Sequence, residues 1–391
     1  MEKTENKFCG KKIIILLGSF IYDATNFFAK ELGKGIAAHG CETVFIDKPS
    51  VEELYSELRK GCSFVLAFNG IGSDISIDGE NIFNKLNIPL AAVLVDHPAH
   101  HIPRLIGNIR DMTVFCCDAS HKVFLEKYFR LERRVGLLHH GGTRLPDPES
   151  PPPKDIGIFF PGTCTYSDEA RYRGLIGQLS PSSKIFTEEV VDIILSMDTV
   201  STEEVFLQHA RNSGFELLDN NELFRNMCPI ISFVEFLVRA IKRRKILKLL
   251  DDAGVSVDIH GKGWENGMFK CHRVFPGAPF VQTLEKMRRA KAVLNICSVP
   301  GSHERVFSSM LNGSVSVNDF NMYLNKNFTD RENIILYRWT QIDKLPEILS
   351  SLLKDDAMRE RILKTSYEEC QTKHTWHHRA GEFLSFMSEA E

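Results

Sequence analysis

The sequence lacks the features that mark a secreted, membrane-spanning or zinc-rich protein. Residues 1–12 are polar and contain no apolar run of the kind that a signal peptide requires. No apolar stretch reaches the roughly 20 residues that a membrane helix needs. The ten cysteines fall singly, apart from Cys116 and Cys117, and no Cys-x-x-Cys pair suggests zinc. We therefore expect a soluble, cytoplasmic protein with reduced thiols and no transmembrane segment.

A strong excess of basic charge is also missing. Lysine and arginine together number 48 against 51 aspartates and glutamates, which gives a net charge of −3. Dedicated nucleic-acid binders are usually basic, so we expect no nucleic-acid partner. The 391 residues are 43% hydrophobic, enough for more than one core. Chains of this length usually divide, so two globular domains are expected.

The first 143 residues alternate short apolar runs with helical patterns. Strands that are apolar on both faces and separated by helices indicate a parallel sheet that is covered on both sides. Residues 1–143 are therefore expected to form a doubly wound, Rossmann-like domain. The predicted strands are residues 13–17, 43–47, 64–68, 91–95, 113–116 and 135–138.

A proline-rich stretch, residues 144–154, separates this domain from a second one. Its five prolines cannot continue a helix or a central strand, so we expect a stiff linker. Residues 155–374 resume the alternation and predict a second Rossmann-like domain, with a helical insertion at about 187–250. The basic residues near the end of that insertion are interpreted as a solvated helix face. Residues 375–391 predict a terminal helix. The fold class is therefore α/β, with two doubly wound domains.

Candidate site residues in the first domain follow its fourth predicted strand. Open α/β sheets bind ligands beyond the carboxyl ends of their strands. Asp96 and His97 lie at such an end, and Pro98 stiffens the turn. A carboxylate beside an imidazole can supply a general base near neutral pH. The alternative is that both are polar loop residues that cap the next helix.

Two glycine-containing turns are candidates in the second domain. Gly162 and Thr163 follow its first strand, where backbone N–H groups can approach a phosphate. Gly261, Lys262 and Trp264 follow another strand and offer a sharp turn, a cation and an indole. An ordinary turn with a core tryptophan explains the second group equally well.

The most informative stretch is residues 294–319, in which a strand exits into a loop and a helix. His303, Glu304 and Arg305 open that helix, where anions are already favoured. A glutamate can accept hydrogen bonds from ribose hydroxyls, and an arginine can bind a diphosphate with two parallel bonds. A helix-capping cluster is the alternative, but the convergence of three polar types favours a binding site.

With these motifs in view, residues 156–387 resemble glycosyltransferases of the GT-B fold. The resemblance is to the CgeB-like branch, which includes spore-maturation proteins, and to group 1 glycosyl transferases. It rests on the segments at 159–163 and at 259–264, on GSHERVFSSMLNGSVSVND and on the closing HTWHHRAGEFL. The N-terminal domain is similar only in general pattern.

The resemblance implies a metal-independent glycosyltransferase with its nucleotide-sugar donor, a UDP-sugar first, in the second domain. Glu304 and Arg305 would meet the donor, Gly162 and Thr163 would lie near its phosphates, and Lys262 and Trp264 would lie near a phosphate or the base. Many relatives have a glutamate where this chain has Ser308, so Glu304 would take over the ribose contact.

The acceptor would be a glycan, a protein or a small molecule in the interdomain cleft, where Asp96 or His97 would act as base. The terminal helix would cross back toward the N-terminal domain, and no cofactor is expected. A non-catalytic nucleotide-sugar-binding protein and a sugar-nucleotide epimerase on the same fold are the alternatives.

Overall fold

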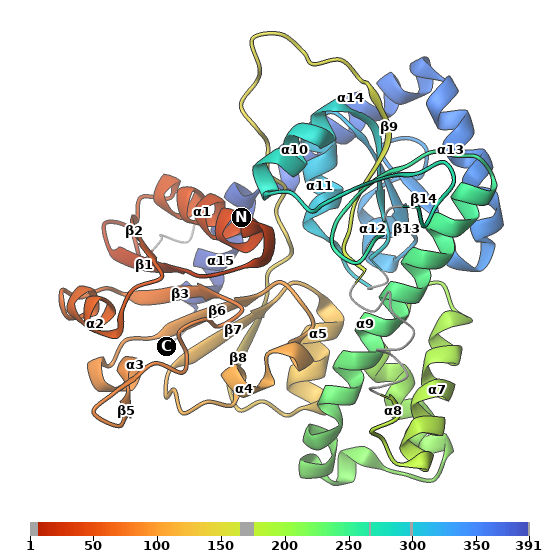
Figure 1. Cartoon of the computed structure of the whole chain (residues 1–391). Coiled ribbons are helices and arrows are strands. Elements are labelled where there is room, and N and C mark those ends of the chain that lie inside the picture. The colour runs from red at the N-terminus through yellow and green to blue at the C-terminus, as the bar shows by residue number, and fades with distance from the viewer. Residues whose placement is uncertain (1–6, 165–175, 266, 298–299, 390–391) are drawn as a thin grey trace. The chain divides into compact units, whose positions relative to one another are not determined.

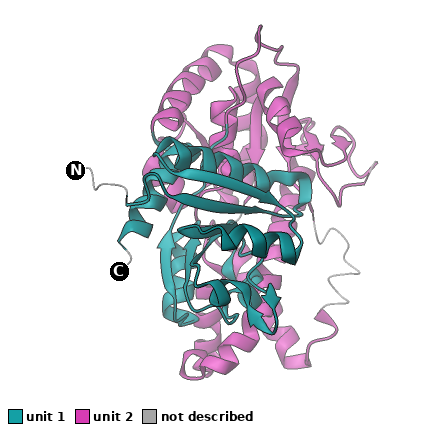
Figure 2. Cartoon of the chain, turned by 90° about the vertical axis from the view of Figure 1, so that its left-hand side faces the viewer, with its two compact units in different colours: residues 1–143, 373–391 teal, residues 144–372 magenta. Residues whose placement is uncertain are grey.

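The computed structural model describes residues 7–164, 176–265, 267–297 and 300–389. The chain divides into two compact units, each built on a parallel sheet (Figure 1, Figure 2). Unit 1 comprises residues 1–143 and 373–391, and unit 2 comprises residues 144–372. None of the described helices combines the length and the apolarity that a bilayer crossing needs.

Unit 1 contains a six-stranded parallel sheet with the order β2-β1-β3-β6-β7-β8. Every residue of β3, β6 and β7 is buried, which explains why these strands are apolar on both faces. Its main strands are β1 (Lys12–Leu17), β2 (Glu42–Asp47), β3 (Phe64–Phe68), β6 (Leu90–Leu94), β7 (Met112–Cys116) and β8 (Arg134–Leu137), and β4 (Ser76–Ile77) and β5 (Glu80–Asn81) form a small hairpin. Its helices are α1 (Ala24–Ala38), α2 (Val51–Arg59), α3 (Ile82–Leu86), α4 (Ile102–Leu105), α5 (Ala119–Val123) and α15 (Trp376–Ser388).

The C-terminal helix α15 packs against α1 in unit 1 (Figure 1). The two helices approach closely at Gly35, where a Cβ atom would lie 2.7 Å from the Cβ of Ala380. Trp376, at the start of α15, is 2% exposed and stacks on Phe28 with 5.4 Å between ring centroids. The last residues of the chain therefore complete the core of the unit that the first residues build.

Unit 2 contains a second six-stranded parallel sheet with the order β11-β10-β9-β12-β13-β14. Counted along the chain this is the order 3-2-1-4-5-6 of dinucleotide-binding Rossmann domains. Its strands are β9 (Ile156–Pro161), β10 (Asp258–His260), β11 (Arg273–Phe275), β12 (Ala290–Asn295), β13 (Val315–Asp319) and β14 (Ile335–Tyr337). Its helices are α7 (Pro181–Leu195), α8 (Thr202–Asn212), α9 (Asn221–Asp252), α10 (Phe280–Arg289), α11 (Glu304–Leu311), α12 (Met322–Asn327), α13 (Leu345–Lys354) and α14 (Asp356–Lys373).

The basic end of α9 differs from the expected solvated face. Arg244, Lys245 and Lys248 are exposed, but Lys242 and Arg243 are only 3% and 7% exposed. The expectation is therefore wrong for these two residues. They face the core of unit 2, where buried cations need hydrogen-bond acceptors.

The packing of α15 predicts that Trp376→Ala destabilises unit 1 by about 3–5 kcal/mol, the usual cost of truncating a buried aromatic side chain. Urea unfolding, with hydrogen exchange of peptides from β3 as the reporter for unit 1, measures this change. The control is Ser385→Ala, because Ser385 lies on the exposed face of the same helix. Equal stability of the two variants would show that α15 contributes little to the unit.

Candidate functional site

The carboxyl edge of the unit 2 sheet has a point at which the strand order reverses. β9 and β12 are central neighbours; the chain continues from β9 to β10 and β11 on one side, and from β12 to β13 and β14 on the other. Loops that leave two such strands diverge, and open α/β sheets bind their ligands in the crevice between them. The segments that follow Pro161 and Asn295 are therefore the place to examine.

The loops after β9 and β10 lie side by side at this edge. The N–H of Gly162 donates to the carbonyl of His260 at 2.9 Å. A Cβ atom on Gly261 would lie 2.3 Å from the carbonyl oxygen of Gly162, so this close approach requires glycine. Lys262 comes next and is exposed. The structure thus brings together Gly162, Thr163, Gly261 and Lys262 from segments that are about 100 residues apart.

Trp264 lies beneath these loops in the hydrophobic core of unit 2. It is 8% exposed, and its ring packs edge-on against Phe160 with 6.2 Å between centroids. Its Nε1–H donates to the carbonyl of Gly162 at 2.6 Å. The indole therefore fastens one loop to the other, and this buried position gives no support to the expectation that Trp264 meets a nucleotide base.

His303, Glu304 and Arg305 lie at the start of α11, which follows β12. The 2.8 Å distance between His303 Nδ1 and Glu304 Oε2 indicates that the ring N–H donates to the carboxylate. Arg305 Nη1 donates to the carbonyl of Pro161, at the end of β9. Glu304 and Arg305 are 4% and 7% exposed, whereas the side chain of His303 is 33% exposed. Arg305 therefore joins α11 to β9, and His303 is the member of the group that solvent reaches.

A buried arginine of α9 lies at the same crevice. Arg243 donates from Nε to the carbonyl of Ile296 at 3.1 Å and from Nη1 to the carbonyl of Thr163 at 2.5 Å. It thereby ties the loop after β9 to the segment after β12. Burial, followed by the charges of Arg305 and Arg239, lowers the pKa of Arg243 to about 9. Two buried guanidinium groups that repel each other favour the binding of an anion.

A carboxylate at the end of β13 partly balances these cations. Asp319 is 5% exposed and accepts a hydrogen bond from the N–H of Cys297 at 3.2 Å. Asp319 also lies near Lys242. Burial lowers the pKa of Lys242, and the negative charge of Asp319 opposes this shift. The buried group thus contains Lys242, Arg243 and Arg305 as cations and Glu304 and Asp319 as anions, and the charge of Asp198 also acts on Lys242.

In unit 1, His97 caps the turn that follows β6. It is 4% exposed, and its Nδ1 accepts a hydrogen bond from the N–H of Ala99 at 3.1 Å. Because Nδ1 is an acceptor, the neutral ring carries its proton on Nε2. While this hydrogen bond is kept, neither ring nitrogen offers a lone pair to a substrate proton, and the position fits the capping alternative.

Asp96 lies near a different histidine, His101. His101 Nε2 is 4.0 Å from Asp96 Oδ2, and the two side chains are 11% and 45% exposed. Nε2 is buried and has no hydrogen-bond partner. Burial lowers the pKa of His101 to about 4, although the charge of Asp96 opposes this effect. The half-exposed carboxylate of Asp96 is the member of this pair that can accept a proton from an acceptor.

The candidate residues that the sequence indicated thus fall into two groups, one at the carboxyl edge of each sheet. Sequence reasoning missed Arg243, because cations that alternate with apolar residues in a long helix are usually solvated. It also passed over His101 in favour of His97, because adjacency in sequence does not show which ring faces the carboxylate.

Residues 235–385 match a family model described as glycosyl transferase-like. The match covers well under half of the chain, and it includes Arg243, the loop at Lys262 and the start of α11. No curated protein matches the sequence.

Solved structures match over almost the whole chain. A T4 phage BGT mutant in complex with UDP-glucose superposes with a TM-score of 0.53 at 10% identity, over 97% of this chain and 99% of that one. HepE from Anabaena in complex with UDP-glucose gives 0.53 at 10% identity, over 97% and 100%. An α-glucosyltransferase in complex with UDP-glucose and DNA gives 0.54 at 10% identity, over 97% and 100%. These similarities confirm the predicted fold of two Rossmann-like domains.

The burial of His101 predicts a pH dependence of stability. Its pKa is about 4 in the folded chain and 6.5 when it is not perturbed, so between these values only the unfolded chain takes up the proton. Its contribution to stability is therefore present above pH 6.5 and lost as the pH falls toward 4. We expect His101→Gln to lose less free energy of unfolding than the wild type between pH 7 and pH 4.5. His377→Gln, at an exposed histidine of unit 1, should change the slope less, and identical slopes for His101→Gln and wild type would contradict the prediction.

Proposed function

We propose that this chain is a nucleotide-sugar-dependent glycosyltransferase that binds its donor, a UDP-sugar first, at the carboxyl edge of the unit 2 sheet. The observation that carries the proposal is the pair of buried arginines, Arg243 and Arg305, at the carboxyl ends of β9 and β12. The glycosyl transferase-like match of residues 235–385 and a fold shared with UDP-glucose complexes support it.

A nucleoside diphosphate would bring negative charge close to Arg243 and Arg305, whose positive charges repel each other. Arg305 uses Nη1 on the carbonyl of Pro161, and within the described part of the chain its Nη2 makes only long contacts, at 3.4 Å to His303 Nε2 and 4.0 Å to Cys297 Sγ. Nη2 can therefore donate to a phosphate oxygen. The exposed ammonium group of Lys262 would approach the diphosphate from the adjacent loop.

The other proposed contacts with the donor come from the loops after β9 and β10 and from the start of α11. Gly162 and Gly261 hold the two loops against each other, Thr163 and Lys262 would lie next to the diphosphate, and His303 with Glu304 behind it would bind the ribose hydroxyls. Since arginine, lysine and the α11 N-terminus supply the positive charge for the leaving diphosphate, the proposed reaction needs no metal ion.

In a direct displacement, the anomeric carbon of the sugar exchanges its bond to the diphosphate oxygen for a bond to an acceptor hydroxyl oxygen. The hydroxyl proton goes to a base, and UDP leaves. We assign the base to Asp96, with the neutral ring of His101 beside it. Of the two candidates in the first domain, we therefore propose Asp96 as the base. His97 instead stabilises the turn after β6 through its hydrogen bond with the N–H of Ala99.

The four motifs quoted above support a place in the CgeB-like branch, with a glycan, a protein or a small molecule as acceptor. One structural neighbour was solved with DNA. The net charge of −3 is the reason that nucleic acid is not among the acceptors proposed here.

Lys262 gives the sharpest test of donor binding, because it is exposed and its removal leaves the core intact. We expect Lys262→Ala to weaken UDP binding about tenfold, the lower limit for losing a hydrogen bond to a charged group. Titration calorimetry measures the affinity. Lys270→Ala is the matched control, since Lys270 is an exposed lysine that precedes β11 at the other edge of the sheet. Equal UDP affinities for both variants would rule Lys262 out of the donor site.

The base assignment predicts that Asp96→Asn lowers the rate of sugar transfer about 10²–10⁴-fold, the usual contribution of general-base catalysis. UDP affinity should stay unchanged, because the donor contacts lie in unit 2. Asp74→Asn, at an exposed carboxylate of unit 1, is the control. Full transfer activity in Asp96→Asn would refute the assignment. Donor turnover that is equal with and without acceptors would instead identify an epimerase or hydrolase.

A further inference from the structure

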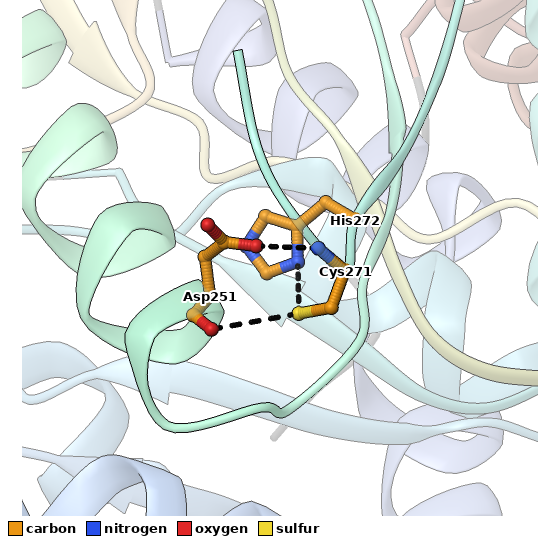
Figure 3. Close-up of side chains that lie close together, drawn as sticks. All are labelled: Asp251, Cys271 and His272. Carbon is orange, nitrogen blue, oxygen red and sulfur yellow. Dashed lines mark hydrogen bonds between the residues drawn. The ribbon is translucent and has the colours of Figure 1, made fainter. Parts of the chain in front are cut away.

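Three side chains of metal-binding type meet where α9 ends and β11 begins (Figure 3). Asp251 lies in the last turn of α9, and Cys271 and His272 directly precede β11. One ligand atom from each side chain lies within 4.8 Å of the other two. Among the residues that the structure describes, no other three histidine, cysteine or acidic side chains gather in this way.

This cluster lies at the amino edge of the unit 2 sheet. The end of α9 leads into β10, and residues 270–272 lead into β11, so both segments enter the sheet here. The donor crevice lies beyond the carboxyl ends of the strands. A ligand bound at the cluster would therefore act on the stability of unit 2 and would take no part in sugar transfer.

The ring of His272 is oriented so that one nitrogen is available to a metal ion. Its Nε2 lies 2.8 Å from the carbonyl oxygen of Leu247, which can only accept, so Nε2 carries the proton. Nδ1 then has the lone pair, and it lies 3.7 Å from Cys271 Sγ. Metal-bound histidines usually donate their other ring N–H to a carbonyl or carboxylate in this way. The present partner of Nδ1 is the N–H of Val257 at 3.3 Å, a long contact that a metal ion would replace.

The carboxylate of Asp251 is fixed in place by backbone donors. Its Oδ1 accepts hydrogen bonds from the N–H groups of Lys270 at 2.9 Å and Cys271 at 2.7 Å, and Oδ2 accepts from Lys270 at 3.0 Å. A carboxylate offers about four lone-pair sites, so these bonds leave room for one more partner.

The spacing of the sulfur and nitrogen atoms suits a tetrahedral ion, and the carboxylate oxygen lies within 4.8 Å of both. Zinc–sulfur and zinc–nitrogen bonds of about 2.3 and 2.0 Å at a tetrahedral angle place sulfur and nitrogen about 3.5 Å apart, close to the 3.7 Å between Sγ and Nδ1. A set of one carboxylate, one imidazole and one thiolate favours zinc over magnesium or calcium. We propose that Asp251, Cys271 and His272 bind a Zn²⁺ ion, with water as the fourth ligand. Binding releases the thiol proton of Cys271 and links α9 to β11.

Cobalt titration of the chelator-treated full-length chain tests this site, because a cobalt–thiolate bond gives a charge-transfer absorption. We expect one Co²⁺ per chain with this absorption, and displacement of the cobalt by Zn²⁺. Cys271→Ser should abolish the absorption, and His272→Gln should weaken Zn²⁺ binding about tenfold or more. Cys117→Ser is the matched control, since Cys117 Sγ also lies near a histidine nitrogen, 3.8 Å from His121 Nδ1, but outside any such group of three.

Absence of a saturable site in the wild type, or an absorption that persists in Cys271→Ser, would overturn the proposal. Loss of the absorption in Cys117→Ser instead would move the metal to unit 1 and overturn it as well. Zn²⁺ should also raise the melting temperature of the wild type and of Cys117→Ser but not that of Cys271→Ser. The circular dichroism of each variant shows whether it is folded. UDP binding needs none of these residues, so the two proposals fail independently.

Discussion

The buried arginines at the junction of β9 and β12 are the constraint on which the rest of unit 2 depends. A guanidinium group that leaves water must find hydrogen-bond acceptors, and Arg243 finds them on the carbonyls of Thr163 and Ile296. Arg305 finds one on the carbonyl of Pro161. These bonds hold the ends of the two central strands in fixed positions. They also place two like charges near each other, and an anionic ligand relieves that repulsion.

Much of the fold could be predicted, because it follows from buried parallel strands. Residues 64–68 are apolar at every position and residues 113–116 at all but Thr113, a pattern that indicates a sheet covered on both faces. β11 could not be predicted, because it is three residues long and begins with an arginine, which pairs with Asp258 at its exposed edge. Residues 144–372 separate α15 from the rest of unit 1, so no local signal places the helix there, and only the family resemblance predicted that it returns to the N-terminal domain.

The candidate site divides in the same way. Glycine and polar residues mark the turns at strand ends in the sequence. This pattern predicted Gly162, Lys262 and Arg305 as candidate site residues. Burial decides the rest. Trp264 was a binding candidate until its ring was found in the core, and Arg243 resembled its solvated neighbours in α9 until the direction of its side chain was known. Neither direction is set by residues close in sequence.

The central claim is that a nucleotide-sugar binds at the carboxyl edge of the unit 2 sheet. Hydrogen–deuterium exchange of the full chain with and without UDP-glucose tests it directly, because bound ligand slows exchange in the backbone that it covers. The account predicts slower exchange at residues 161–164, 261–264 and 301–306, with little change at residues 270–275 on the opposite edge. Unchanged exchange in those three segments with UDP-, GDP- and CDP-sugars alike would contradict it.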